Sequence, residues 1–267
     1  MKTNRKKPKI DSLLIAISFL ALGIVLLDIS VFSNSQVICF IGLSLTFWGA
    51  LFLLITPKKQ VEGSFLVTST LPAYMTIDRM LKDMKPKSEA YYIPSYPKDA
   101  YLPEYLKGLK EMVTFIPEEH AIGMAAFEDI AKGKFLIENP KGLLITPPGL
   151  CILDKIQQKL ATDLTRIPIS ELAETLQYLL SDLYLTKEIK ITTNENEVTI
   201  EITGSLYKKL YSPEYNLKSI NLLGCPLVSA AACAIAKSTG KPTIIQKIET
   251  TPNGKTTTAT FKIVQSD

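Results

Sequence analysis

The chain has 267 residues, 46% of them hydrophobic, and a net charge of +4. Seven of its 30 basic residues and two of its 26 acidic residues precede Gln60, so the part that follows carries 23 basic and 24 acidic residues, a net charge of −1. The basic excess therefore belongs to the N-terminal sixty residues, and we expect no surface that binds nucleic acid.

Cysteine and histidine are sparse. The chain has four cysteines, no CxxC pair and one histidine, His120. Zinc sites usually draw four closely spaced ligands from these residue types, and no such set is present in the local sequence. We therefore expect no metal or cofactor, and free thiols of the kind found in a reducing compartment.

Two long apolar stretches, at about residues 12–32 and 37–56, dominate the first domain, residues 1–60. The first contains a single charge, Asp28, and the second contains none. A bilayer core about 30 Å thick needs roughly 20 helical residues, and the backbone in lipid must be paired within the segment. The pattern predicts a transmembrane helical hairpin closed by the short polar turn from Ser33 to Gln36.

Basic residues flank the hairpin at both outer ends, and the turn has none. They are Lys2, Arg5, Lys6, Lys7, Lys9, Lys58 and Lys59. Since positive charge stays on the cytoplasmic side, we expect these residues at the membrane interface and a multi-pass cell-membrane protein with both termini in the cytoplasm. An alternative is a signal peptide cleaved near Val31 and Ser33, after which the second helix would still anchor the product.

Small residues recur every four positions along the second helix, at Gly42, Thr46 and Ala50. Such a strip lets helices approach closely. The first helix of the hairpin is the expected partner, and homodimerisation is the alternative.

Residues 61–141 are predicted to form a first α/β subdomain. A strand is expected at Ser64–Thr68, and Pro72 then opens a helix. The proline- and tyrosine-rich segment from Lys85 to Pro103 indicates a loop or a short edge strand. A further helix is expected between Pro103 and Pro117, and a short strand at Lys134–Ile137.

Residues 142–267 are predicted to form a second subdomain. A strand at residues 142–146 is followed by two helices, one through Leu153 and one opened by Pro168. Alternating residues then predict a hairpin at about 189–202, a helix at 226–237 and a final hairpin at 243–264. The cytoplasmic part is thus expected to be an α+β domain with a mixed or antiparallel sheet and helices on one face.

Cys225 is the candidate catalytic residue. It stands just before Pro226 at the start of the predicted helix, where unpaired amides and the helix dipole lower a thiol pKa. It could act as a nucleophile or as a redox sensor. The alternative is that Cys225 is a small core residue at the head of an alanine-rich helix packed closely on the sheet.

Roughly the last eighty residues resemble the carboxy-terminal half of the 4-vinyl reductase-type domain. The resemblance rests on Gly204-Ser205-Leu206 after a strand, on Gly224-Cys225-Pro226 before a small-residue helix, and on the final hairpin. The family's terminal Gly-Asp-x-x-Cys-type signature is absent, so the resemblance implies a small-molecule-binding fold without its metal or redox chemistry. The whole layout is similar to that of uncharacterised archaeal-type two-helix membrane proteins.

These observations favour a membrane-anchored cytoplasmic module that is not catalytic. It would bind a hydrophobic small molecule or a protein partner, with an apolar pocket beside Ala230–Cys233. The alternative function is that of a thiol-dependent enzyme or redox sensor that uses Cys225.

Overall fold

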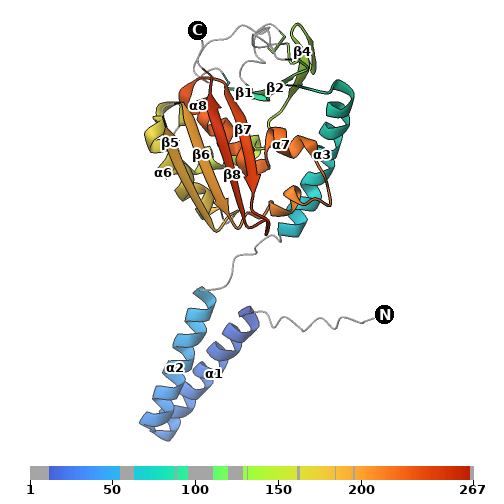
Figure 1. Cartoon of the computed structure of the whole chain (residues 1–267). Helices are drawn as coiled ribbons and strands as arrows, with labels where there is room; N and C mark the ends of the chain where they lie inside the picture. The colour runs from blue at the N-terminus through green and yellow to red at the C-terminus, as the bar shows by residue number, and fades with distance from the viewer. Residues whose placement is uncertain are drawn as a thin grey trace, which may run out of the picture. The chain divides into compact units, whose positions relative to one another are not determined.

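The structure is a computed structural model of the chain (Figure 1). It describes residues 12–54, 63–87, 89–95, 111–119, 129–130, 132–160, 163–183, 185–194 and 196–264. The chain divides into two compact units, Met1–Val61 and Glu62–Asp267.

The N-terminal unit is a helical hairpin of α1 (Ser12–Ser33) and α2 (Gln36–Leu54). The two helices agree with the predicted stretches to within two residues at each end. Asn34 makes the turn with a φ of 48°, a left-handed conformation that asparagine tolerates better than most residues. Most large apolar side chains of the hairpin are exposed, although both helices are long and apolar enough to cross a membrane.

Glycines form the contact between α1 and α2. A Cβ atom added at Gly23 would lie 2.6 Å from Cγ2 of Thr46, and one at Gly49 would lie 2.8 Å from the backbone nitrogen of Leu20. Gly42 and Thr46 therefore lie at the contact, whereas Ala50 is exposed. Two helical turns cover about 7.2 residues, so the position that follows Gly42 along the contact is Gly49 and not Ala50.

Among the described residues, three helical segments are long and apolar enough to cross a membrane: Ile15–Ser33, Gln36–Leu54 and Lys218–Thr239. The third differs from the others because 89% of its most apolar window is buried within the protein. It is also interrupted by Gly224 and Cys225, which separate α7 from α8.

The C-terminal unit combines helices with an antiparallel sheet, the α+β layout expected from the sequence. Its helices among the described residues are α3 (Gly63–Met84), α5 (Leu150–Leu160), η2 (Leu164–Arg166), α6 (Ile169–Asp182), η3 (Lys208–Tyr211), α7 (Lys218–Leu223) and α8 (Pro226–Thr239). Its strands are β1 (Tyr91–Ile93), β2 (Val113–Pro117), β3 (Leu136–Glu138), β4 (Lys141–Ile145), β5 (Glu188–Asn194), β6 (Glu197–Thr203), β7 (Thr243–Thr250) and β8 (Thr256–Ile263).

The described strands form one sheet in the order β3-β4-β2-β1-β7-β8-β6-β5, and each neighbouring pair is antiparallel. β1 pairs with β7, matching Tyr91 with Ile244 and Tyr92 with Thr243. Strands from both sides of the predicted boundary at residue 141 therefore belong to the same sheet. The predicted C-terminal hairpins correspond to β5–β6 and β7–β8.

The main core lies between the sheet and the helices α3, α5, α6 and α8. Alternate residues of β6 and β8, such as Ile200 and Phe261, point into it, and Figure 1 shows α8 behind these strands. The residues between them are more exposed. β1 is covered on both sides, because Tyr92 belongs to the main core while Ile93 packs in a second cluster with Phe115 and Ile130.

Three predictions about the first half of this unit were wrong. Ser64–Thr68 is not a strand but the beginning of α3, whose residues Val67, Tyr74 and Leu81 are buried at intervals of seven. β1 is not at an edge of the sheet, since it lies between β2 and β7. Residues 113–117 form β2 rather than the end of a helix; the earlier part of that predicted helix lies outside the described residues.

Candidate functional site

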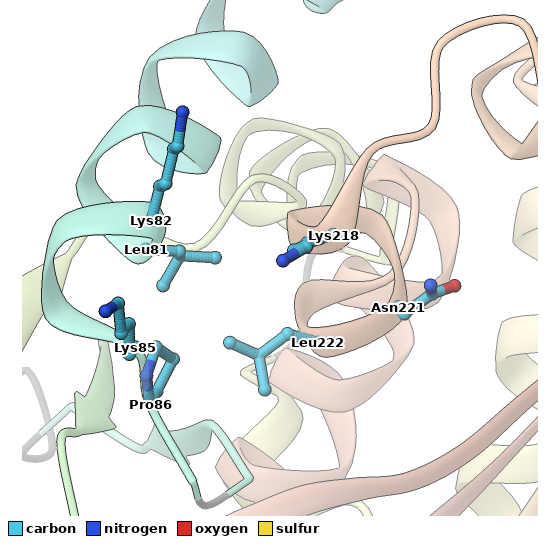
Figure 2. A pocket seen from close by; sticks show the side chains of 7 residues that line it. All are labelled: Leu81, Lys82, Lys85, Pro86, Lys218, Asn221 and Leu222. Atoms are coloured by element: carbon cyan, nitrogen blue, oxygen red, sulfur yellow. The ribbon is translucent and has the colours of Figure 1, made fainter.

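An open groove of about 530 Å³ lies between α3 and α7. Its lining residues are Leu81, Lys82, Lys85, Pro86, Lys218, Asn221 and Leu222. Figure 2 shows Leu81 and Leu222 pointing toward one another across the groove. The groove therefore has an apolar floor contributed by two segments far apart in the sequence.

Three lysines line the groove beside this apolar floor, and one of them points into it. In Figure 2 the side chain of Lys218 is directed into the groove, whereas Lys82 extends away from it along α3. Lys85 contributes a third ammonium group at the end of the same helix, and the lining contains no carboxylate. An apolar surface beside several cations suits a ligand that is partly apolar and negatively charged.

Asp78 of α3 fixes the position of α7, the second wall of the groove. Its carboxylate accepts hydrogen bonds from the backbone amides of Lys218 and Ser219, at 3.1 and 2.6 Å. The hydroxyl of Ser219 in turn donates to the carbonyl oxygen of Tyr74 at 3.2 Å. Because a carboxylate bound to the first amides of a helix stabilises its start, α3 both lines the groove and holds the opposite wall.

Three tyrosines hold the turn between α7 and α8. The hydroxyls of Tyr74 and Tyr92 donate to the carbonyl oxygens of Gly224 and Leu223, and the amide of Cys225 donates to the hydroxyl oxygen of Tyr211 at 2.9 Å. Gly224 has a φ of 69°, and a Cβ atom there would lie 2.5 Å from Cγ1 of Val228. The turn thus requires glycine both for its backbone conformation and for space.

Cys225 lies in this turn but is only 1% exposed. Burial raises the pKa of its thiol, even though a hydrogen bond with Tyr211 and the amides of Val228 and Leu227 act in the opposite direction. The amides at the helix start therefore do lower the pKa of the Cys225 thiol as predicted, but desolvation raises that pKa by more. A thiol with a raised pKa and no access to solvent is a poor nucleophile.

Of the other three cysteines, one is buried and two are exposed. Cys233 is buried in α8, and burial raises the pKa of its thiol as well. Cys151 is exposed on α5, and Cys39 on α2. Within the described ranges, no group of three or more His, Cys, Asp and Glu side chains is arranged to hold a metal ion; His120 lies outside those ranges.

A second hollow lies between α6, β5 and β6, beside Ile235 in the C-terminal half of α8. It is lined in part by Leu176, Ile200 and Ile235 and encloses about 10 Å³. A single water molecule needs at least roughly 10–15 Å³. This hollow is therefore far too small for an organic ligand.

The predicted membrane-interface residues Arg5, Lys6, Lys7, Lys9, Lys58 and Lys59 all lie outside the described residues. The lysines of the groove were not found by sequence analysis. Lys82 and Lys85 resemble ordinary basic residues near the end of a helix, where they favour the dipole. Lys218 lies more than a hundred residues further on, and no local pattern connects it with them.

The chain combines a hairpin of two helices long enough to cross a membrane with an α+β unit built on an antiparallel sheet. These two features define its class. Within this class the chain belongs to the family of the domain of unknown function DUF7982, which matches residues 4–262. The match includes both units of the structure.

No curated protein and no solved structure matches the chain significantly. The resemblance of the last eighty residues to the 4-vinyl reductase-type domain, and that of the whole layout to archaeal-type membrane proteins, therefore stay predictions.

Proposed function

We propose that the chain is a membrane-anchored binding module and not an enzyme. In this proposal α1 and α2 cross the membrane, both termini and the C-terminal unit are cytoplasmic, and the groove between α3 and α7 binds a ligand. The charge pattern supports the orientation, because the basic residues flank the outer ends of the hairpin and the turn is uncharged.

The proposal assigns two membrane spans and not three. The third apolar segment, Lys218–Thr239, supplies the centre of the main core. Moving it into lipid would expose the inward-facing side chains of β6 and β8 and leave the cytoplasmic unit without its central helix. The burial of this segment is thus a strong physical argument for two spans.

The observation that carries the binding function is the groove itself. Its volume of about 530 Å³ falls within the roughly 300–1,000 Å³ typical of small-molecule sites. Leu81 and Leu222 supply apolar contact, and Lys218 supplies a charge directed into the same space. We therefore propose that the ligand is an organic anion with an apolar part, of the kind that a hydrophobic carboxylate or an alkyl phosphate represents.

Hexyl phosphate tests this proposal, and uncharged hexanol serves as the matched probe. Calorimetric titration of the full chain in nanodiscs, corrected for empty nanodiscs, should show binding of hexyl phosphate and weaker binding of hexanol. Lys218→Glu should weaken hexyl phosphate binding about tenfold, or ~1.4 kcal/mol. The control Lys241→Glu changes an exposed lysine beyond the far end of α8 and should have no effect. Equal binding by both variants would exclude the groove as the site.

Protease protection tests the orientation. Protease added to intact cells should leave the C-terminal unit uncut, and cell lysis should make it accessible. Digestion of that unit in intact cells would overturn the proposed topology.

The alternative function, a thiol-dependent enzyme or redox sensor based on Cys225, has less support. Such chemistry needs a thiolate that solvent and substrate can reach. The burial and raised pKa of Cys225 favour a packing role instead.

A further inference from the structure

Helix α3 exposes an unusual surface, which we call its outer face. It comprises Phe65, Thr68, Ser69, Pro72, Met75 and Thr76, all exposed, and continues toward the end of the helix with Arg79 and Lys82. The opposite side packs against the domain through Val67, Tyr74 and Leu81. The residues of the outer face follow one another at intervals of one or three, so they share one side of the helix.

The first fifteen residues of α3, Gly63–Ile77, contain no charged residue. The solvent side of an ordinary surface helix carries charged and polar side chains. Here Phe65 is 69% exposed and Met75 is 46% exposed. Neither side chain belongs to the hydrophobic clusters that hold the domain together.

The hydroxyl groups on the outer face do not need water as an acceptor. Thr68 donates to the carbonyl oxygen of Ser64, and Thr76 to that of Pro72, each at 2.9 Å. Ser69 donates to the carbonyl oxygen of Leu66 at 2.9 Å. Because these donors are satisfied within the helix, the face can leave water at a lower cost than an ordinary serine- and threonine-rich surface. In the hairpin helices, the hydroxyls of Ser33 and Ser44 likewise donate to backbone carbonyl oxygens four residues earlier.

We propose that the outer face of α3 lies in the interface of a bilayer that contains anionic lipids. Phe65 and Met75 would enter the boundary between headgroups and acyl chains, as the apolar side of an interfacial helix does. Arg79 and Lys82 would contact phosphate groups of the headgroups. Of the acids near them, Asp78 is bound to the amides of α7. Asp83 is exposed four residues after Arg79 and shares this side of the helix, so Arg79 and Lys82 exceed it by one positive charge at this end of the outer face.

The length of the connecting chain favours lipid over a second protein as the occupant. Only eight residues, 55–62, separate the end of α2 from the start of α3, and they can span about 30 Å at most. The inference rests on the proposed membrane span of α2, which would keep the start of α3 within that distance of the membrane surface at all times.

Lipid-dependent fluorescence quenching tests this inference on the full chain in nanodiscs. Trp48 of α2 is the only tryptophan, so W48F provides a background in which F65W or M75W adds a single reporter. In nanodiscs that contain phosphatidylglycerol brominated at shallow acyl positions, both reporters should show a blue-shifted emission and at least twofold quenching. The matched control is W48F/Y178W, because Tyr178 is 72% exposed on α6; its fluorescence should stay unquenched.

Each other result has a distinct meaning. Quenching at position 65 no stronger than at position 178 would overturn the inference, and so would a blue-shifted emission without quenching, since protein and not lipid would then cover the face. Equal quenching in purely neutral brominated lipid would overturn the role of Arg79 and Lys82. Trp48 in the unmodified chain reports separately on the anchor: if bromolipid does not quench it, the proposed membrane span itself fails.

Discussion

The hydroxyl of Tyr74 donates a 2.7 Å hydrogen bond to the carbonyl oxygen of Gly224, 150 residues away in the chain. Tyr92 makes the equivalent bond to the neighbouring carbonyl of Leu223 at 2.6 Å. These two bonds connect α3 and β1 to the turn between α7 and α8. The same turn carries Cys225 and ends the helix that forms one wall of the groove, so both candidate sites depend on it.

Replacing Tyr92 with Phe should destabilise the C-terminal unit. The hydroxyl of Tyr92 also contacts Oγ of Ser229 at 3.1 Å, and all three groups are buried. A buried polar group left without its partner costs about 1–3 kcal/mol, and urea unfolding of the purified protein should show a loss of this size. The control Tyr178→Phe, at an exposed tyrosine, should change the free energy of unfolding by less than about 0.5 kcal/mol. Equal stability of the two variants would mean that the Tyr92 bonds contribute nothing.

Replacing Asp78 with Ala should loosen α7 and the groove together. The carboxylate caps the amides of Lys218 and Ser219, and removal of a capping side chain costs about 0.5–2 kcal/mol. Hydrogen exchange at these two amides should become faster, and hexyl phosphate should bind less well. Asp83→Ala removes an exposed carboxylate from the same helix and should leave both measurements unchanged. Faster exchange without weaker hexyl phosphate binding would mean that binding does not depend on how firmly α7 is held.

The sequence predicted those parts of the fold that local patterns determine. The hairpin helices and α8 have long apolar runs, α6 has leucines at helical spacing, and the strand pairs β5–β6 and β7–β8 have clear alternation. The strand expected at Ser64–Thr68 was wrong because Phe65, Val67 and Thr68 favour strands locally, whereas burial at Val67, Tyr74 and Leu81 selects the helix. Tertiary packing overrode local propensity here.

The site was less predictable than the fold. The position of Cys225 at the head of a helix could be read from Pro226, but its pKa depends on burial by side chains from distant elements. Similarly, the groove forms where Asp78 and Tyr74 of α3 bond to Lys218 and Ser219 of α7, residues far apart in the sequence. No periodicity in the sequence indicates that Leu81 and Leu222 face one another.

The three cysteines of the C-terminal unit should react with N-ethylmaleimide at different rates. Cys151 is exposed in the C-terminal unit, while Cys225 and Cys233 are buried and have raised thiol pKa values because of that burial. At neutral pH, mass spectrometry should find Cys151 modified first and the two buried thiols modified only after denaturant is added. Rapid modification of Cys225 in the folded protein would instead revive the thiol-dependent alternative.

Gly49→Leu should disrupt the hairpin. A Cβ atom at this position already lies 2.8 Å from the backbone nitrogen of Leu20, so a larger side chain forces α1 and α2 apart. The matched variant Ala50→Leu places the same side chain at the next, exposed position and should be tolerated. Cross-linking between cysteines introduced on the two helices should fall for Gly49→Leu alone. An equal decrease in both variants would indicate that Ala50 also faces a partner, as expected if the hairpin forms a homodimer.

The buried thiol of Cys225 should make the stability of the C-terminal unit fall at alkaline pH. Burial raises the pKa of Cys225 above its ordinary value of 9.0, so in the folded state the group holds its proton after the unfolded chain has lost it. The contribution of Cys225 is therefore fully present below pH 9 and is lost as pH rises from there toward the raised folded-state pKa. A single group of this kind lowers the free energy of unfolding by up to about 1.4 kcal/mol per pH unit.

Urea unfolding between pH 7 and 10 should show a weaker pH dependence for Cys225→Ser than for the unmodified protein. It should show no change for Cys151→Ser, where the thiol is exposed. Cys233, whose thiol pKa burial also raises, contributes the same kind of loss from pH 9 upward in all three proteins. The buried tyrosines Tyr74 and Tyr92, whose pKa values burial raises as well, extend it above pH 10. If Cys225→Ser retains the full pH dependence, the thiol is accessible to solvent in the folded state and the packing role assigned to it is wrong.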